Sequence, residues 1–505
     1  MSTTNTNWGG GYVTDIEYIE GFYAQQSPTH LSLSCLLRGV TVPMPGPDDP
    51  VSYLELGCGH GVGALILAAS NPAWRVTAID YNPAHIASAR AMAAAAGVGN
   101  ISFLEADLGS LAGSAAARAV PEADFTSLHG VWTWVAPEVR QGIVRLLAEK
   151  VRPGGVVHVS YNALPAWQGM LGMQRLILEA GRRGGWRSDA RTAAGLGFAR
   201  ELNEAGAHYL QTSPLAQHLL TATKDQAAEY VTHEYMNEHW APAFHADVAA
   251  AMAGAKLDWV STASLLESFP QLMLTEPQRE LYERHDDPAM RELVMDTCVQ
   301  RQFRHDVYVR GARRMLAGER DTHLSALSVT PIVAPSEMDT SLSVPAGKAE
   351  MGPGLQWIIA DALQGPATIG ELLSRQPGVS NPAELTAILV STGQAQPVLR
   401  PAAEQAPAAS RLNRLLGGRV RSMLGQSGAA GLASSQLGTG LVAPRLIQFI
   451  AGRLLAGERE DNSAHWTAEL SRDLDDTARE ELATLIRTAI ERRVPVLRRL
   501  GIVPP

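Results

Sequence analysis

Cysteine is scarce in this chain of 505 residues. Its three cysteines, Cys35, Cys58 and Cys298, lie far apart, and no Cys-x-x-Cys spacing occurs. An odd number of cysteines cannot pair completely within one chain, so the sequence predicts no disulfide framework. A reducing compartment fits this usage best, and we therefore expect a cytoplasmic location.

Long hydrophobic runs are also missing. The longest candidate, residues 441–455, is interrupted by Pro444, Arg445 and Arg453, and it falls short of the roughly 18 apolar residues that span a bilayer. The first ten residues, MSTTNTNWGG, carry neither the basic start nor the apolar stretch of a signal peptide. The sequence therefore predicts no membrane insertion.

An excess of positive charge is absent as well. The chain has 42 Lys and Arg against 51 Asp and Glu, which gives a formal net charge of −9. This balance disfavours a nucleic-acid partner, because such binding relies on cations that neutralise phosphates. Apolar residues make up 46% and charged residues 18%, so a large core and about three folded domains are expected.

Strand and helix patterns alternate through the first third of the chain. Five apolar runs, each followed by a helical pattern or a glycine turn, predict a parallel sheet with right-handed crossovers. Two further strand-like runs, 256–262 and 303–311, are interpreted as the sixth and seventh strands of that sheet. The five runs are 51–56, 75–80, 101–107, 123–128 and 156–161. The predicted fold is an α/β, Rossmann-like sheet of seven strands whose ligands bind at the carboxyl ends of the strands.

The remainder of the chain predicts additions to this core. We expect a core over 1–165, a helical insertion over 166–239, a segment supplying strands six and seven over 240–317, and a mostly helical C-terminal domain over 318–505. Within the last part, residues 317–356 have the composition of a linker with short strands. Residues 426–441 are small and flexible in composition, and Pro495 is expected to kink or break the last helix.

A glycine-rich loop follows the first predicted strand and opens a helix. It contains Gly57, Gly59, Gly61 and Gly63, with Glu55 at the end of the strand. Glycines let the backbone turn tightly and approach a ligand closely, and the helix N-terminus adds outward N–H groups. The sequence therefore predicts a nucleotide-type cofactor at this loop.

Two acids support this prediction but leave two cofactors open. Asp80 ends the second strand, where a carboxylate can accept from both ribose hydroxyls, and Asp107 ends the third, where it can accept from an adenine amine. The spacing Gly59-x-Gly61-x-x-Ala64 also suits a nicotinamide dinucleotide. The pattern of an acid, one residue and then GxGxG resembles instead the class I methyltransferases that use S-adenosylmethionine, which we favour.

A more specific resemblance lies outside the glycine loop. The stretches HGVWTWV (129–135), SYNALPAW (160–167) and VTHEYMNEHWAPAFHADV (231–248), with residues 21–43, resemble the bacterial methyltransferases that carry a methyltransferase regulatory domain. That family includes rickettsial protein-lysine methyltransferases. The resemblance implies a methyltransferase core with S-adenosylmethionine as cofactor, helical additions and a homodimer. It is good over about 10–315 and loose beyond.

The resemblance and the strand ends together give a set of expected site residues. For the cofactor these are Glu55, Gly57, Cys58, Gly59, Gly61, Asp80, Tyr81, Asp107, Leu108, His129 and Gly130. For the chemistry we expect Trp132 and Tyr161 to face the sulfonium and Asn162 to orient the acceptor. Aromatic rings of the N-terminal arm, Tyr12, Tyr18, Phe22 and Tyr23, could fold over the cofactor.

Methyl transfer from a sulfonium needs a nucleophile held in line, dry and without its proton. An apolar aromatic channel lowers the pKa of a lysine amine by desolvation, so a protein lysine is the favoured acceptor. No Asn/Asp-Pro-Pro-Tyr motif follows the fourth strand, which disfavours amide or adenine N-methylation. The group His233, Glu234, His239 and His245 lacks the HExxH spacing, and no metal is predicted. A small-molecule N- or O-methyltransferase and an inactive cofactor-binding module stay open as alternatives.

Overall fold

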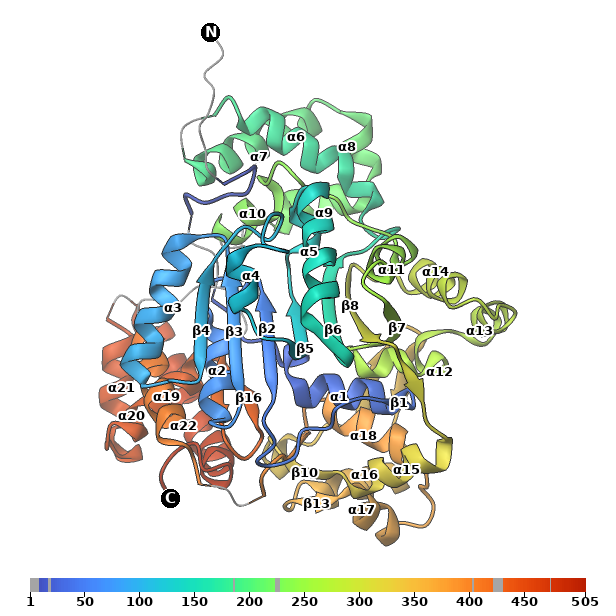
Figure 1. Cartoon of the computed structure of the whole chain (residues 1–505). Helices are drawn as coiled ribbons and strands as arrows, with labels where there is room; N and C mark the ends of the chain where they lie inside the picture. Colours follow the sequence, from blue (N-terminus) through green and yellow to red (C-terminus); the bar gives the residue numbers. More distant parts are fainter. Residues whose placement is uncertain are drawn as a thin grey trace.

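A seven-stranded sheet forms the centre of the computed structural model (Figure 1). The structure describes residues 9–16, 20–184, 187–222, 228–401, 404–420, 430–472 and 474–505. The strand order is β4-β3-β2-β5-β6-β8-β7. These strands are β2 (Ser52–Leu56), β3 (Arg75–Asp80), β4 (Ile101–Glu105), β5 (Ala123–Leu128), β6 (Val151–Asn162), β7 (Leu257–Thr262) and β8 (Phe303–Arg310).

The pairing confirms the predicted seven-stranded topology. The strands from β4 to β6 run parallel, and β8 lies antiparallel between β6 and β7. Strands six and seven are therefore neighbours in the core sheet, although more than ninety residues of chain separate β6 from β7. Because β2 to β5 all run the same way, their carboxyl ends meet at one edge, where ligands of such sheets bind.

Side chains of the strands alternate between two helical layers. On β6, Val156 packs with the layer that contains α2 and α3, whereas Val157 and Val159 pack with the layer that contains α5 and α11. Burial on both faces explains why these strands are continuous apolar runs. The helices of this part are α1 (Pro28–Leu37), α2 (Val62–Ser70), α3 (Pro83–Ala96), α4 (Ala115–Ala119), α5 (Pro137–Lys150) and α11 (His245–Ala253).

Local signals in the sequence explain the ends of α3. The Asn82 side chain accepts a hydrogen bond from Ala84 N at 2.9 Å, Pro83 fills the first helical position, and Gly97 ends the helix with φ 65°. An N-cap, a proline at N1 and a left-handed glycine are the usual helix boundaries. These three residues therefore account for both ends of α3.

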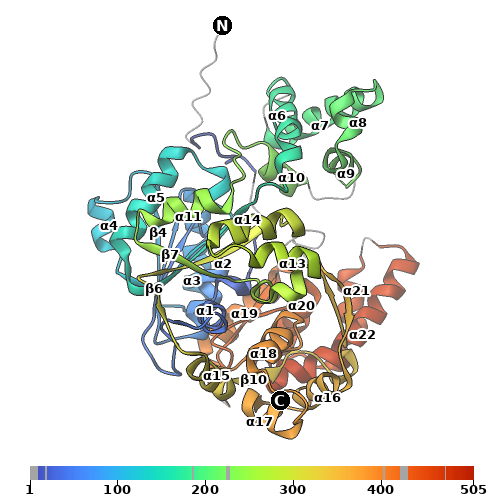
Figure 2. The same ribbon diagram turned by 90° about the vertical axis from the view of Figure 1, so that its right-hand side faces the viewer.

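A group of helices without strands lies beyond the carboxyl edge of the sheet, at the top of Figure 1. Its own apolar cluster includes Met173, Ile177 and Leu210. The helices are α6 (Leu171–Gly181), α7 (Ser188–Glu204), α8 (His208–Thr212), α9 (Pro214–Ala222) and α10 (Ala228–Tyr235). Figure 2 shows the same group set apart from the C-terminal helices.

The chain after β7 forms two further apolar clusters beside the sheet. Short helices and strands precede them: α12 (Pro270–Met273), α13 (Glu276–Glu283), α14 (Pro288–Val299), and the pair β1 (Val40–Thr41) with β9 (Arg313–Arg314). The first cluster lies within α15 (Ala317–Ala326), β10 (Ser328–Pro331), β11 (Ser341–Val344), β12 (Gly347–Glu350), α16 (Pro353–Ala362), β13 (Ala367–Thr368), α17 (Ile369–Arg375), α18 (Pro382–Ser391) and β14 (Ala395–Pro397). The second lies within β15 (Gly431–Ser434), β16 (Thr439–Val442), α20 (Arg445–Leu455), α21 (Ser463–Leu470) and α22 (Asp476–Arg499). The apolar side chains of α19 (Pro407–Arg419) belong instead to the core cluster that contains α2 and α3.

The structure corrects the expectation for residues 426–441 and shows no break at Pro495. Residues 430–441 are not loose, because β15 and β16 form a buried hairpin whose glycines admit the ring of Phe22; a Cβ on Gly440 would lie 2.6 Å from that ring. Residues 426–429 lie outside the described part. Pro495 does not break α22, since its neighbours Val494 and Val496 are buried and hold the last turns in place. Among the described residues, no helix combines the length and apolar composition needed to cross a membrane.

Candidate active site

A cavity of about 290 Å³ opens at the carboxyl edge of the sheet. Residues at or just after the ends of β2, β3, β4 and β5 line it, and so does the N-terminal arm (residues 9–16 and 20–26). Ten of the eleven expected cofactor residues lie in its wall: Glu55, Gly57, Cys58, Gly59, Asp80, Tyr81, Asp107, Leu108, His129 and Gly130. The topology thus brings together residues that are spread over about 75 positions of the sequence.

The glycine loop shapes one wall of the cavity. Gly57 has φ 76°, and a Cβ there would lie 2.3 Å from Val131 of the opposite loop. Gly61, which does not line the cavity, has φ 69° at the N-terminus of α2, and a Cβ there would lie 2.6 Å from the Phe103 ring. Both positions need glycine, the first for a close approach across the cavity and the second for the turn into the helix.

Glu55 is a buried carboxyl group with an unused oxygen. It is 6% exposed, and its Oε2 has no hydrogen-bond partner among the described residues. Burial, with a smaller contribution from the charge of Asp80, raises its pKa to about 8. A buried carboxyl oxygen without a donor costs free energy, and a cationic ligand in the cavity would supply that donor.

Asp80 is held in a fixed orientation before any ligand arrives. Its Oδ2 accepts from Gly59 N at 2.8 Å, and its Oδ1 accepts from Asn82 N at 2.9 Å. The imidazole of His85 lies 3.2 Å from Oδ1, and the ring of His60 lies 4.4 Å from that of His85. Sequence reasoning missed His60 and His85, although both lie within five residues of an expected site residue.

Asp107 stands at the exposed side of the cavity. Its Oδ1 accepts from Gly109 N at 2.8 Å, and its Oδ2 accepts from Ser110 Oγ at 3.1 Å. These bonds fix the turn after β4 and keep the carboxylate at the rim. The neighbouring Leu108 adds apolar surface to the same wall.

The loop after β5 forms the opposite wall. His129 Nδ1 lies 2.9 Å from Ser160 Oγ, and the same hydroxyl accepts from Gly130 N at 2.9 Å. Burial, followed by the effect of His305, lowers the pKa of His129 to about 3, so this imidazole is neutral. The Tyr23 ring lies 4.2 Å from that of His129.

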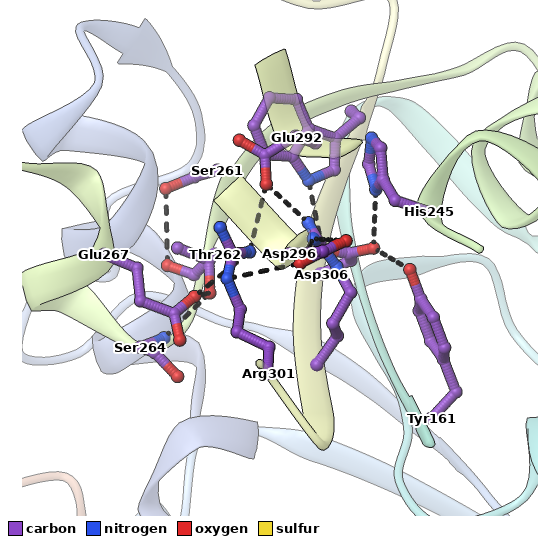
Figure 3. A network of polar contacts seen from close by, with 12 residues as sticks. Tyr161, His245, Ser261, Thr262, Ser264, Glu267, Glu292, Asp296, Arg301 and Asp306 are labelled. Atoms are coloured by element: carbon purple, nitrogen blue, oxygen red, sulfur yellow. Dashed lines mark hydrogen bonds and ion pairs between the residues drawn. The ribbon is translucent and has the colours of Figure 1, made fainter. Parts of the chain in front are cut away.

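The expected orientation of Tyr161 and Asn162 requires correction. Tyr161 is fully buried, and its hydroxyl donates to Asp306 Oδ2 at 2.5 Å, as Figure 3 shows. Asn162 Nδ2 donates to Glu234 Oε1 at 2.9 Å, and neither residue lines the cavity. Tyr161 shares the α5 and α11 face with Val157 and Val159, because residues two apart on a strand point the same way.

Trp132 also points away from the cofactor cavity. It is 4% exposed within the apolar cluster of that same face, and Arg140 lies 5.5 Å from the centre of its ring. Trp134, two residues further on, lines the cavity instead, together with Tyr12 and Tyr23. The aromatic wall exists, but other rings than the expected pair supply it.

Asp306 belongs to a buried network of charges that joins α14 to β8 (Figure 3). Arg304 contacts Asp296, Glu292 and Asp306, each within 2.8 Å. Although burial alone would raise the pKa of Asp306, the Arg304 guanidinium holds it well below its usual range. A paired charge network of this kind specifies a unique packing, here of the strand that carries the hydroxyl partner of Tyr161.

The described residues of the N-terminal arm line the cavity and are held by contacts at two places. Val13 N donates to Asn237 Oδ1 at 2.9 Å near α10, and Glu20 pairs with Arg419 of α19 at 2.7 Å. Of the expected arm aromatics, Tyr12 and Tyr23 line the cavity, whereas Phe22 packs in the β15–β16 hairpin. Tyr18 lies outside the described residues.

The charges around the cavity are of one sign. Its described wall contains four carboxyl groups, those of Glu20, Glu55, Asp80 and Asp107, and neither lysine nor arginine. Such a wall favours cationic ligands by long-range attraction. With the orphaned Glu55 oxygen and the prearranged Asp80, the residues present fit S-adenosylmethionine, which carries a sulfonium, an ammonium and a ribose diol.

Comparisons with known proteins agree with this arrangement. Residues 54–155 match a family model described as a methyltransferase domain, and residues 227–310 match one described as a predicted methyltransferase regulatory domain. An uncharacterized protein of Synechocystis is 31% identical over 462 residues, which are 90% of this chain and 89% of that protein. An uncharacterized protein of Rickettsia prowazekii is 24% identical over 232 residues, which are 44% of this chain and 86% of that protein.

A solved structure shares the fold over nearly the whole chain. PKMT2 from Rickettsia typhi, in complex with AdoHcy, aligns with a TM-score of 0.68 at 16% identity. The alignment covers 96% of this chain and 99% of that one. The core, the helical insertion and the C-terminal region therefore occur together in that structure as well.

Proposed function

Since this chain belongs to the methyltransferases that carry a methyltransferase regulatory domain, we propose that it transfers methyl groups from S-adenosylmethionine to a lysine amine of a protein. The observation that carries the proposal is the cavity wall, which combines four carboxyl groups with the rings of Tyr12, Tyr23 and Trp134. Acidic groups attract both a cationic cofactor and a cationic acceptor. Aromatic faces stabilise a methylated ammonium as it forms.

Each wall of the cavity has a distinct part in binding the cofactor. The free oxygen of Glu55 would accept from the ammonium of the methionine moiety, and Asp80 would accept from the ribose hydroxyls. Asp107, at the rim, would accept from the adenine amine. The bound cofactor supplies the electrophilic methyl group, so the protein's own task is to hold both partners and to exclude water.

The aromatic rings prepare the acceptor. An amine that passes Tyr12, Tyr23 and Trp134 loses solvent, which lowers its pKa and favours the neutral, nucleophilic form. The indole N–H of Trp134 is buried and has no partner within the described part of the chain, so it can donate to a ligand. Tyr12 is partly buried, and burial, followed by the charge of Asp80, raises the pKa of its hydroxyl, which therefore stays protonated and can donate a hydrogen bond.

A second candidate is methylation of a small molecule. Contacts of Glu20 and Val13 hold the arm against the rest of the chain, and a cavity that the arm covered would suit a small acceptor better than a folded protein. In this alternative the same residues hold the cofactor, and only the acceptor differs. The arm would then stay closed around the acceptor during transfer, whereas a lysine side chain needs an opening to the surface.

Incubation of the full chain with methyl-labelled S-adenosylmethionine and a bacterial protein extract separates these candidates. The proposal predicts label in protein and methyl mass increments on lysine, both reduced in Asp80→Ala when S-adenosylmethionine is limiting. Label confined to the small-molecule fraction would favour the second candidate. Tight cofactor binding with no labelled product in either fraction would identify a binding module without turnover.

A further inference from the structure

Three histidines from adjacent strands meet behind the wall of the cofactor cavity. His129 follows β5, His158 lies in β6 and His305 lies in β8, and one ring nitrogen of each lies within 4.8 Å of the others. The ring centres are separated by 5.3 Å, 5.6 Å and 6.0 Å. His158 is fully buried, whereas His129 and His305 are partly exposed. We call these residues the histidine cluster.

The hydrogen bonds around His158 direct a nitrogen lone pair into the cluster. Ser127 Oγ donates to Gln26 Oε1 at 3.1 Å, so it is left to accept from His158 Nδ1 at 3.0 Å. His158 Nε2 therefore carries no hydrogen and points to His305 Nδ1, 3.1 Å away. On the other side, Ser160 Oγ contacts His129 Nδ1, so Ser160 does not engage Nε2, the second ring nitrogen of His129.

This arrangement has the parts of a metal site. Imidazoles that bind a metal through one nitrogen are usually fixed by a polar group on the other, as Ser127 and Ser160 are placed to do. We propose that the histidine cluster binds a divalent first-row transition-metal cation through His129, His158 and His305.

The distances are compatible with such a cation after a small adjustment. Zinc bonds to imidazole nitrogens at about 2.0–2.1 Å, which places the nitrogens of a tetrahedral site about 3.4 Å apart. The pair His158 and His305 is already at 3.1 Å. All three candidate nitrogens lie within 4.8 Å of one another, so the partly exposed His129 would have to move toward the other two when a cation binds. Three imidazoles leave a fourth position for water or another ligand.

A cation at this place would act on the cofactor cavity through its charge. His129 belongs both to the cluster and to the cavity wall. A dication beside the cavity repels a sulfonium more than it repels an uncharged thioether. We therefore expect bound zinc to weaken the binding of S-adenosylmethionine more than that of S-adenosylhomocysteine. By linkage, S-adenosylmethionine should weaken the binding of zinc by the same factor. The site itself does not depend on which acceptor the enzyme methylates.

Zinc titration of the dialysed full-length protein tests the proposal, with Co²⁺ absorption reporting the coordination number. We expect one Zn²⁺ per chain and the visible spectrum of four- or five-coordinate cobalt. Ser127→Ala should weaken zinc binding by about 10–100-fold, the usual effect of losing a group that hydrogen-bonds to a ligand. His305→Ala should weaken zinc binding further. His218→Ala, which removes an exposed histidine outside the cluster, should change nothing.

Folding of each variant is checked by its melting temperature and by S-adenosylhomocysteine binding, and the zinc test uses His305→Ala because His305 is partly exposed whereas His158 is fully buried. Absence of stoichiometric zinc binding in the wild type would overturn the proposal and leave the histidine cluster as a hydrogen-bonded array. Equal zinc affinity in His305→Ala and His218→Ala would overturn it as well.

Discussion

Replacement of Glu55 by glutamine separates two effects of this carboxyl group. One is the stability that it costs the cofactor-free protein, and the other is the affinity that it gives the cofactor. The folded protein holds the Glu55 pKa at about 8 against an ordinary 4.5. When folding raises the pKa of a group, the stability that this group contributes is greatest at a pH below its pKa in the unfolded chain. That contribution is lost as the pH rises through its pKa in the folded protein. The stability lost through Glu55 therefore grows from pH 4.5 to pH 8 and levels off above.

The magnitude follows from the two pKa values. Their difference, 8 − 4.5 = 3.5, corresponds to an upper limit of about 5 kcal/mol at about 1.4 kcal/mol per pKa unit. Because the carboxyl group lines a cavity that water enters, we expect the cost of an unsatisfied buried group, about 1–3 kcal/mol. Glu55→Gln should be more stable than the wild type by this amount at pH 8.5 and nearly equal to it at pH 4.5.

Binding should change in the opposite direction. Loss of a charge-assisted hydrogen bond to the cofactor ammonium costs about 1.5–3 kcal/mol, or roughly 10–150-fold in the Kd of S-adenosylmethionine. Urea unfolding across pH without cofactor and calorimetric titration with cofactor measure the two effects. Glu122→Gln, an exposed control, should show neither. A pH-independent stability difference together with unchanged cofactor affinity in Glu55→Gln would refute the reasoning.

Three other predictions concern the ribose, the aromatic wall and the arm. Asp80→Ala should weaken S-adenosylmethionine by about tenfold or more in calorimetry, and unchanged binding by a folded variant would contradict its assignment. Trp134→Ala should slow single-turnover methyl transfer by about 100-fold at nearly constant cofactor affinity. Trp132→Ala should mainly lower the free energy of unfolding, by about 3–5 kcal/mol. The reverse pattern would show that Trp132, and not Trp134, acts in the site. Arg419→Met removes the cation paired with Glu20 and should speed S-adenosylhomocysteine release about tenfold in stopped-flow experiments, and an unchanged rate would show that this ion pair does not hold the arm closed.

Much of the sheet could be predicted from the sequence because its signals are local. The apolar runs ending in Glu55 and Asp80, the glycine loop between them and the capped helix after Asn82 each reveal themselves within a few residues. The strands at 257–262 and 303–310 are assigned to the same sheet from short strand-like runs, with further support from the family resemblance. Their partners lie far away in the sequence, and short apolar runs alone do not specify pairing.

The acceptor side of the site could not be predicted in the same way. Successive side chains of a strand point to opposite faces of the sheet, so a shift of one residue changes the face. Knowing that Tyr161 lies at the carboxyl end of β6 therefore does not predict that its side chain points to Asp306. Likewise, the short helical turn after β5 places Trp134 at the cavity wall, where the sequence predicts Trp132. The histidine cluster unites three strands, and no spacing within the sequence signals that contact.

Identification of the methylated atom tests the central claim most directly. After reaction of the full chain with methyl-labelled S-adenosylmethionine and a bacterial protein extract, mass spectrometry of the labelled peptides locates the new methyl groups. Our account predicts methyl increments on lysine amines in the wild type and their loss in Trp134→Ala, which keeps the cofactor site intact. Labelled products found only among small molecules, or methyl groups on oxygen, would contradict it.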